Sequence, residues 1–253
     1  MDRRGTLRAV TALGVGALAG GCDASSARPA PAVSSSSAAP LGGSNERPAP
    51  GAPRLPDEVT HGPRDRNVVA LTFHGQGDPA MVGRLLDQIA VGGARVTVLA
   101  VGTWLSAYPQ LGRRIVDAGH ELGNHTQHHG EINRMPAARV HAEIADCARV
   151  LRSVTGSIGR WFRPSQTRHA SAAVRAAAAR VGYATCLSYD VDSFDYTDPP
   201  PSAIVSRTLA AVRPGSIVSL HFGHPATIAA MPSLLHGLRG RGLAPVTMTE
   251  LMT

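Results

Sequence analysis

The 253-residue sequence contains no lysine, so all 25 of its basic residues are arginine, and aromatic residues make up only 4% of it. The apolar run at 9–19 is too short to cross a bilayer, and the composition excludes a multi-span membrane protein. No glycine-rich phosphate loop follows any predicted strand, which leaves nucleotide binding without support. With 43% hydrophobic residues, the chain is neither fully disordered nor a collagen-like repeat.

Charge of one sign predominates, because the net charge is +7 and the isoelectric point is about 10.3. The arginines are spread over many predicted helices rather than gathered in one segment. Such a distribution is typical of a solvated surface, so we expect no nucleic-acid partner.

Residues 1–21 have the layout of an export signal, with Arg3, Arg4 and Arg8 before an apolar run that ends in small residues. The arginine pair resembles a twin-arginine signal. Cys22 ends a stretch that resembles a bacterial lipobox, although alanine stands where leucine is usual, three places before the cysteine. We therefore predict an exported protein, lipid-anchored through Cys22 at the outer face of the cell membrane, or secreted. Ordinary cleavage beside an incidental cysteine is the alternative.

Residues 22–63 are rich in serine, alanine, proline and glycine and carry almost no large apolar side chain. Such a segment cannot bury enough surface to offset the entropy of ordering it. It is therefore predicted to be a disordered tether. The folded domain is expected at residues 64–253, which is long enough for one hydrophobic core.

Short apolar runs alternate with segments of helical spacing along the rest of the chain. This alternation predicts an α/β fold with parallel strands and right-handed crossovers, which an open sheet and a barrel satisfy equally. The predicted strands are 67–73, 95–101, 184–189, 216–220 and 245–248, and the predicted helices are 79–91, 111–118, 135–154, 171–181, 202–212 and 228–241.

Cys147 lies in a predicted helix and Cys186 in a predicted strand. We expect both to be buried free thiols, and a disulfide formed in an oxidising compartment is the alternative.

Histidines and carboxylates gather where the predicted strands end, the place where parallel α/β folds collect their chemistry. His125 and His129 are four residues apart, so in a helical turn both rings would face one side and could share a metal ion. A polar surface turn gives the same spacing. His128 faces another direction and is expected to contact solvent or another group. His221 ends a later strand and is a candidate proton donor.

Several segments occur in a fixed order: HELGNHTQHH, WFRPSQ, DVDSFDY, GSIVSLH and the closing LLHGLRGRGLAPVTMTELM. Together they resemble the polysaccharide deacetylase (NodB-homology) family, carbohydrate esterase family four, over residues 67–252. The resemblance implies a distorted seven-stranded (β/α) barrel. It also implies metal-dependent removal of acetyl groups from N-acetylglucosamine or related sugars.

The same resemblance implies roles for individual residues. His125 and His129 would bind a divalent ion, most simply zinc, with cobalt or manganese as alternatives. Arg163 would orient the catalytic base, and Asp192 would tune His221, the general acid.

The family's first motif precedes these segments in the chain, and here it departs from the family pattern. The family has two carboxylates after a Thr-Phe pair, one as the base and one as the third metal ligand, whereas this chain reads TFHGQGDP. His74 stands at the base position and Gly75 at the ligand position. His74 could act as ligand or base because neutral imidazole does both. Alternatively, Asp78 takes over one carboxylate's role from a longer loop, or the metal site is degraded.

Three further residues are expected to bind the substrate. Tyr196 falls where the family usually has a tryptophan that lines the acetyl pocket. Gln166 ends WFRPSQ, which resembles the family's third motif, and replaces the usual aromatic there, whose backbone N–H helps to hold the oxyanion. Ser219 stands where a leucine commonly lines the pocket for the acetyl methyl group.

The expected function is that of an exported, metal-dependent hydrolase that removes N-acetyl groups from N-acetylglucosamine-type glycans such as peptidoglycan or chitin. We expect a monomer whose membrane contact is the lipid anchor alone. A non-catalytic glycan-binding module that lost its base is the first alternative. A hydrolase of a small amide or ester is the second.

Overall fold

The computed structural model describes residues 55–253. The predicted export signal at 1–21, the lipidation site Cys22 and the tether as far as residue 54 lie outside the described residues. Among the described residues, no helix is both long and apolar enough to cross a membrane.

Strand β2 (Val68–Gly75) lies at the centre of a parallel sheet. It pairs with β3 (Thr97–Ala100), β7 (Ile217–His221) and β8 (Ala244–Val246). Its side chains alternate between two cores, because Val69, Leu71 and Phe73 belong to the main cluster and Ala70 to a second one. A strand buried on both faces reads as a continuous apolar run, and for this reason the sequence predicted it well.

Two more strands extend this sheet. β4 (Glu121–Asn124) pairs with β3, and β6 (Val191–Asp192) pairs with β7, again in parallel. Beyond β4, Phe162 forms parallel bridges to Asn124 and to Cys186. These bridges continue the sheet past its longer strands.

The expected start of the domain at residue 64 is wrong. β1 (Glu58–Val59) pairs in parallel with β5 (Cys186–Leu187), and the Glu58 carboxylate accepts a hydrogen bond from the backbone of Ala170. A bridge between His61 and Ser216 then joins this end of the sheet to the start of β7. The strands therefore close into the distorted barrel that the resemblance implied. A two-residue strand carries no periodicity, so the sequence could not reveal it.

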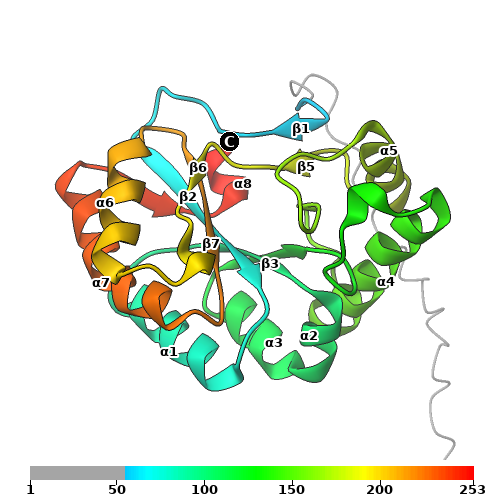
Figure 1. The fold of residues 1–253 in the computed structure, drawn as a ribbon, viewed down its shortest axis with the longest axis horizontal. Coiled ribbons are helices and arrows are strands. Elements are labelled where there is room, and N and C mark those ends of the chain that lie inside the picture. The colour runs from blue at the N-terminus through cyan, green and yellow to red at the C-terminus, as the bar shows by residue number, and fades with distance from the viewer. Residues whose placement is uncertain (1–54) are drawn as a thin grey trace, which may run out of the picture. The chain divides into compact units, whose positions relative to one another are not determined.

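The helices surround the strands (Figure 1). They are α1 (Pro79–Val91), α2 (Gly102–Ala107), α3 (Pro109–Asp117), α4 (Ala137–Thr155), α5 (Ala172–Val181), α6 (Pro201–Ala211), α7 (Pro225–Gly240) and α8 (Met248–Leu251), with single 3-10 turns at Ile132–Arg134 and Asp195–Thr197.

Helix α1 shows how local sequence sets these boundaries. The Asp78 carboxylate caps the helix by accepting hydrogen bonds from the backbone N–H groups of Ala80 and Met81, both at 3.0 Å. Pro79 occupies the first turn, where its missing N–H costs nothing. The apolar face then buries Val82, Leu85, Leu86 and Ile89. The observed bounds equal the predicted ones.

Both described cysteines are free and buried, as expected. Cys147 packs in the main core and Cys186 in a separate cluster. Burial raises the pKa of each thiol to about 12, so neither is a reactive thiolate at neutral pH.

Candidate active site

Parallel pairing brings polar side chains from distant segments to one end of the barrel. His74 of β2 stands opposite His221 of β7 in the strand register, and their rings stack with centroids 4.2 Å apart. His125 follows β4 directly, and its N–H donates to the carbonyl of Ala100 at the end of β3. The carboxyl ends of four strands thus meet at the site.

The segment that carries His125 and His129 is not the helical turn that we expected. Thr126 and His129 have φ angles of 70° and 57°, in the left-handed region that side chains other than glycine rarely adopt. The Thr126 hydroxyl holds this turn by accepting from the His129 N–H at 3.1 Å and by contacting Ser165. The tight turn nevertheless brings the two imidazole rings to a centroid distance of 4.8 Å.

His128 faces away from this pair, as predicted. Its ring Nδ1 lies 2.8 Å from the carboxylate of Glu143 on α4, which also accepts the His128 backbone N–H at 2.8 Å. Glu143 is buried, and its second partner is Arg139 one helical turn earlier. The Glu143 carboxylate thus anchors the turn that contains His128 to helix α4.

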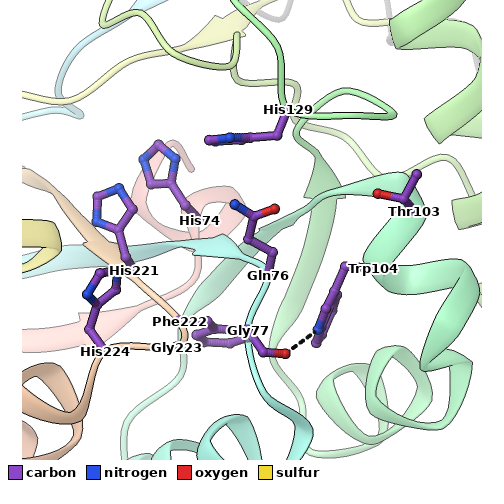
Figure 2. Close-up of a pocket in the computed structure, with 10 residues that line it drawn as sticks. All are labelled: His74, Gln76, Gly77, Thr103, Trp104, His129, His221, Phe222, Gly223 and His224. Carbon is purple, nitrogen blue, oxygen red and sulfur yellow. Dashed lines mark hydrogen bonds between the residues drawn. The ribbon is translucent and has the colours of Figure 1, made fainter.

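His74, His125 and His129 form a cluster whose nitrogen donor atoms all lie within 4.8 Å of one another. The closest pair is His74 Nδ1 and His125 Nε2, at 2.7 Å. His74 Nε2 lies 3.1 Å from the hydroxyl of Ser219. Figure 2 shows the His74 ring between His221 and His129, with Trp104 on the opposite side of the pocket.

The donor chemistry of this cluster fits a divalent metal ion. Burial lowers the pKa of His74 and of His125 well below 6.5, and the neighbouring imidazoles lower both further. Burial also lowers the pKa of His129. The His125 Nδ1–H donates to the carbonyl of Arg163 at 2.9 Å, an arrangement that leaves Nε2 unprotonated and turned to the cluster. Three neutral imidazoles are a ligand set that zinc accepts.

Gly75, at the family's third ligand position, has no room for a side chain. A Cβ atom there would lie 2.7 Å from Val98 Cγ1 and 3.0 Å from the Ala100 Cα of the neighbouring strand. The geometry also does not support the alternative in which Asp78 supplies the missing carboxylate. Its side chain is exposed and capping α1, and it is absent from the cluster of metal-ligating groups.

The expected partner of His221 is also wrong. Asp195, and not Asp192, contacts the ring, with His221 Nδ1 2.7 Å from its carboxylate. The same carboxylate accepts the His221 backbone N–H and the Thr227 hydroxyl. Burial alone would raise the pKa of Asp195, but its contacts with His221 and Thr227 outweigh burial and lower it. Asp192 instead caps the turn by accepting from the Phe194 N–H at 2.9 Å.

Arg163 lies beneath the site, completely buried. Its guanidinium donates to the Thr72 hydroxyl at 2.8 Å and to the carbonyls of Leu187 and Ser188. Burial lowers its pKa to about 10. The guanidinium hydrogen-bonds to no candidate base among the described residues, and one of its nitrogens, Nη1, has no partner there. The contact that Arg163 makes with the cluster is through its backbone carbonyl, to His125.

Two cavities of about 550 and 570 Å³ share His74, Gln76, His129, His221 and His224 in their linings. They are therefore two lobes that meet at the histidine cluster. The Trp104 lobe is completed by Gly77, Thr103, Trp104, Phe222 and Gly223, and the Arg168 lobe by Gln166, Thr167, Arg168, Tyr189, Tyr196 and Ser219. In the Trp104 lobe the indole N–H donates to the carbonyl of Gly77 (Figure 2).

The structure places all three residues expected to bind substrate in the Arg168 lobe. Tyr196 is 44% exposed, with its ring centroid 5.1 Å from that of His221. Gln166 donates through its side-chain amide to the carbonyl of His129 at 3.0 Å, and Ser219 contacts His74. Their contribution to substrate binding stays a prediction.

Sequence reasoning missed Asp195, Gln76 and Trp104. Asp195 directly precedes Tyr196, and a carboxylate adjacent to a pocket aromatic was the available signal. Gln76 follows the altered first motif and lines both lobes. Trp104 lies in the short helix α2, which was not predicted.

Comparison with known proteins supports one family. A family model described as polysaccharide deacetylase matches residues 61–186. A chitooligosaccharide deacetylase of Bradyrhizobium sp. strain ANU 289 is 32% identical over 197 residues, which cover 69% of this chain and 85% of the relative. A peptidoglycan-N-acetylglucosamine deacetylase of Bacillus cereus is 28% identical over 200 residues, with 75% of this chain and 90% of the relative covered.

The fold has counterparts among solved structures. A pseudoenzyme of carbohydrate esterase family four from Bacillus anthracis matches with a TM-score of 0.73 and 22% identity. The match covers 78% of this chain and 69% of that one. At this identity the likeness supports the barrel architecture.

Proposed function

The chain belongs to the polysaccharide deacetylase family, whose deacetylases hydrolyse carbon–nitrogen bonds other than peptide bonds, and we propose that it removes N-acetyl groups from an N-acetylglucosamine-type glycan. The observation that carries the proposal is the junction of the two lobes. There a cluster of neutral imidazoles faces a histidine whose other nitrogen is held by a buried carboxylate.

The proton chemistry follows from the tautomer of His221. Since Nδ1–H donates to Asp195, Nε2 is the nitrogen left to face the pocket. Nε2 would take a proton from the attacking water and return it to the amine as the carbon–nitrogen bond breaks. Asp195 would stabilise the imidazolium formed between these steps. No carboxylate lines either lobe in the described part of the chain, which favours an imidazole as the proton acceptor.

We propose that His74, His125 and His129 hold a divalent ion, with zinc the simplest choice and cobalt or manganese as alternatives. A bound ion would polarise the acetyl carbonyl and lower the pKa of a bound water. His125 would be kept in the ligating tautomer by the Arg163 carbonyl, and Ser219 would hold the far nitrogen of His74.

The first test is acetate release by residues 55–253 from N-acetylchitooligosaccharides and from peptidoglycan fragments. The protein is stripped by chelation, and zinc, cobalt or manganese is restored one at a time. We expect release that returns with metal. Release that is unaffected by chelation would contradict the metal proposal and leave the deacetylase proposal standing.

The variant His74→Gln tests the proposed ligand role of His74 against the alternative in which His74, and not His221, takes the proton from water. If His74 is a ligand, metal affinity falls with activity. If His74 is the base, metal affinity stays and only kcat falls. Dialysis against a metal buffer measures the affinity directly.

The missing carboxylates favour one second candidate, a glycan-binding module without activity. Gly75 has no room for the usual ligand, and the described residues offer no replacement carboxylate at the cluster. Saturable glycan binding, with no acetate released under any metal, would establish that candidate instead.

The site of action is a separate proposal. We propose that the protein is exported and lipid-anchored through Cys22, on the strength of the arginine pair and the lipobox-like stretch in residues 1–21. Growth with a radiolabelled fatty acid tests it, because a Cys22→Ala variant of the full chain should lose the label.

A further inference from the structure

The lining of the Arg168 lobe carries a positive charge, which a neutral glycan does not require. Arg168 lines it, and neither lobe is lined by an aspartate or glutamate within residues 55–253. Arg168 is exposed, and no carboxylate of the described chain lies within 4.0 Å of its guanidinium to form an ion pair. The Arg168 guanidinium thus lies beside the histidine cluster with no ion-pair partner among residues 55–253.

The guanidinium is also held in place. Its Nε and Nη2 both donate to the carbonyl of Tyr189, at 3.3 and 3.0 Å, and its carbon lies 5.1 Å from the centre of the Tyr189 ring. The Arg168 carbonyl in turn accepts from the Ser188 hydroxyl at 2.7 Å. An arginine tethered at both its backbone and its guanidinium loses less conformational entropy when a ligand binds than a free surface arginine does.

The groups around Arg168 leave its positive charge available to a ligand. The same Tyr189 ring lies under the buried Arg163, whose guanidinium carbon is 5.4 Å from the ring centre. The Asp192 carboxylate, which lies beside the Tyr189 hydroxyl, accepts hydrogen bonds from that hydroxyl and from the Phe194 N–H. Arg168 Nη1 forms no hydrogen bond with any described residue, so it and the outer N–H of Nη2 can pair with a carboxylate.

We propose that the Arg168 lobe is a subsite for a carboxylate on the substrate, so that the preferred glycan is an anionic amino-sugar polymer. This inference rests on the proposed deacetylase function and narrows its substrate class. The carboxylate could belong to an acidic substituent of the sugar ring or to a peptide attached to the glycan. Both present the same chemistry to the guanidinium.

The test compares kcat/KM on matched oligosaccharides with the metal-loaded enzyme. One is a neutral N-acetylglucosamine tetramer, and one is a peptide-free peptidoglycan tetramer that carries its lactyl carboxylates. The same peptidoglycan tetramer with methyl-esterified carboxylates, and one with its peptides retained, complete the set. We expect Arg168→Gln to lower kcat/KM about tenfold on carboxylate-bearing oligomers, through KM. The neutral and esterified tetramers should change less than about twofold.

The matched control is Arg180→Gln, which makes the same change of charge at an exposed residue of α5. It should leave kcat/KM unchanged on both the neutral and the anionic oligosaccharides. Arg168→Lys should restore only part of the loss, because an ammonium cannot form the paired hydrogen bonds of a guanidinium. If only the peptide-bearing oligomer responds, the carboxylate belongs to the peptide. If the peptide-free tetramer responds equally, it belongs to the sugar.

Equal losses on neutral and anionic substrates, or no loss on either, would overturn the inference. Equilibrium binding of the same oligosaccharides to both variants keeps the test independent of catalysis. If no substrate releases acetate under any metal, the proposed function fails. A selective loss of affinity for the anionic tetramer would then still support the subsite.

Discussion

The two halves of the site are built in different ways. On the β7 side, His221 and Asp195 form a pair whose hydrogen bonds are met within the protein, with Thr227 and the His221 backbone as further donors. On the β2 side, the carboxylates typical of the family are absent, and imidazoles occupy the space. In the first half a buried carboxylate holds the imidazole that would move a proton, whereas the second half brings three imidazoles together, with His74 Nδ1 2.7 Å from His125 Nε2. Because the two halves share no side-chain hydrogen bond among the described residues, the proposed acid–base pair and the proposed metal site can be tested separately.

The largest expected effect is on the metal half. His125→Ala or His129→Ala should lower kcat by at least about 10³-fold, because each would remove a ligand of the proposed ion that polarises the carbonyl. Metal content after desalting should fall in parallel. His128→Ala is the control from the same turn, since His128 contacts Glu143, and it should keep the metal and lose less than about tenfold in kcat. Full activity in His125→Ala would remove the cluster from the mechanism.

The second-largest effect on kcat is expected at the His221–Asp195 pair. Asp195→Asn should lower kcat by about 10²- to 10⁴-fold, since an amide does not fix the Nδ1–H tautomer or stabilise the imidazolium. Metal affinity should stay unchanged in this variant, which separates the two halves. Asp192→Asn, measured beside it, should keep kcat within about threefold because Asp192 caps Phe194. The opposite ranking of the two variants would restore Asp192 as the partner of His221.

The metal-free protein should lose stability in acid. The pKa values of His74, His125 and His129 are lowered in the folded state, so below pH 6.5 the unfolded chain binds protons that the folded chain excludes. Stability is full above pH 6.5 and falls as the pH drops, by at most about 1.4 kcal/mol per pH unit for each histidine. His120, whose pKa burial also lowers, acts in the same direction.

Urea unfolding in a chelator at pH 7.5, 6.5 and 5.5 measures this dependence. His125→Gln should flatten the slope, and a profile that is already flat in the unmodified protein would show that the histidines titrate alike in both states.

The smallest effect concerns Asp78. Asp78→Ala should lower the free energy of unfolding by about 1 kcal/mol through loss of the α1 cap and leave kcat within about twofold. Asp78→Asn retains a capping side chain and should change neither quantity. A large drop in kcat for both variants, with the fold intact, would return Asp78 to the list of candidate bases.

The corrections share one cause, which is long-range contact. Asp192 and Asp195 are equivalent in the sequence pattern, and only the placement of β7 beside the 3-10 turn at Asp195–Thr197 selects Asp195. The start of the domain was missed because β1 is recognised through its pairing with β5, more than a hundred residues later. β4 was missed because its sequence, ELGN, carries little apolar signal although three of its residues are buried.

The sequence by itself determined the alternation of strands and helices, the bounds of α1, the order of the family's motifs and the identity of the histidines. These follow from local periodicity, capping and spacing, which act within a few residues. Only the tertiary structure decided that Gly75 has no room beside Val98 and that Asp78 is a helix cap. It also decided that Arg168 lines the lobe beside His221 without a carboxylate partner in the described part of the chain. Each of those depends on which strand or loop lies alongside, and that is set by the packing of the whole barrel.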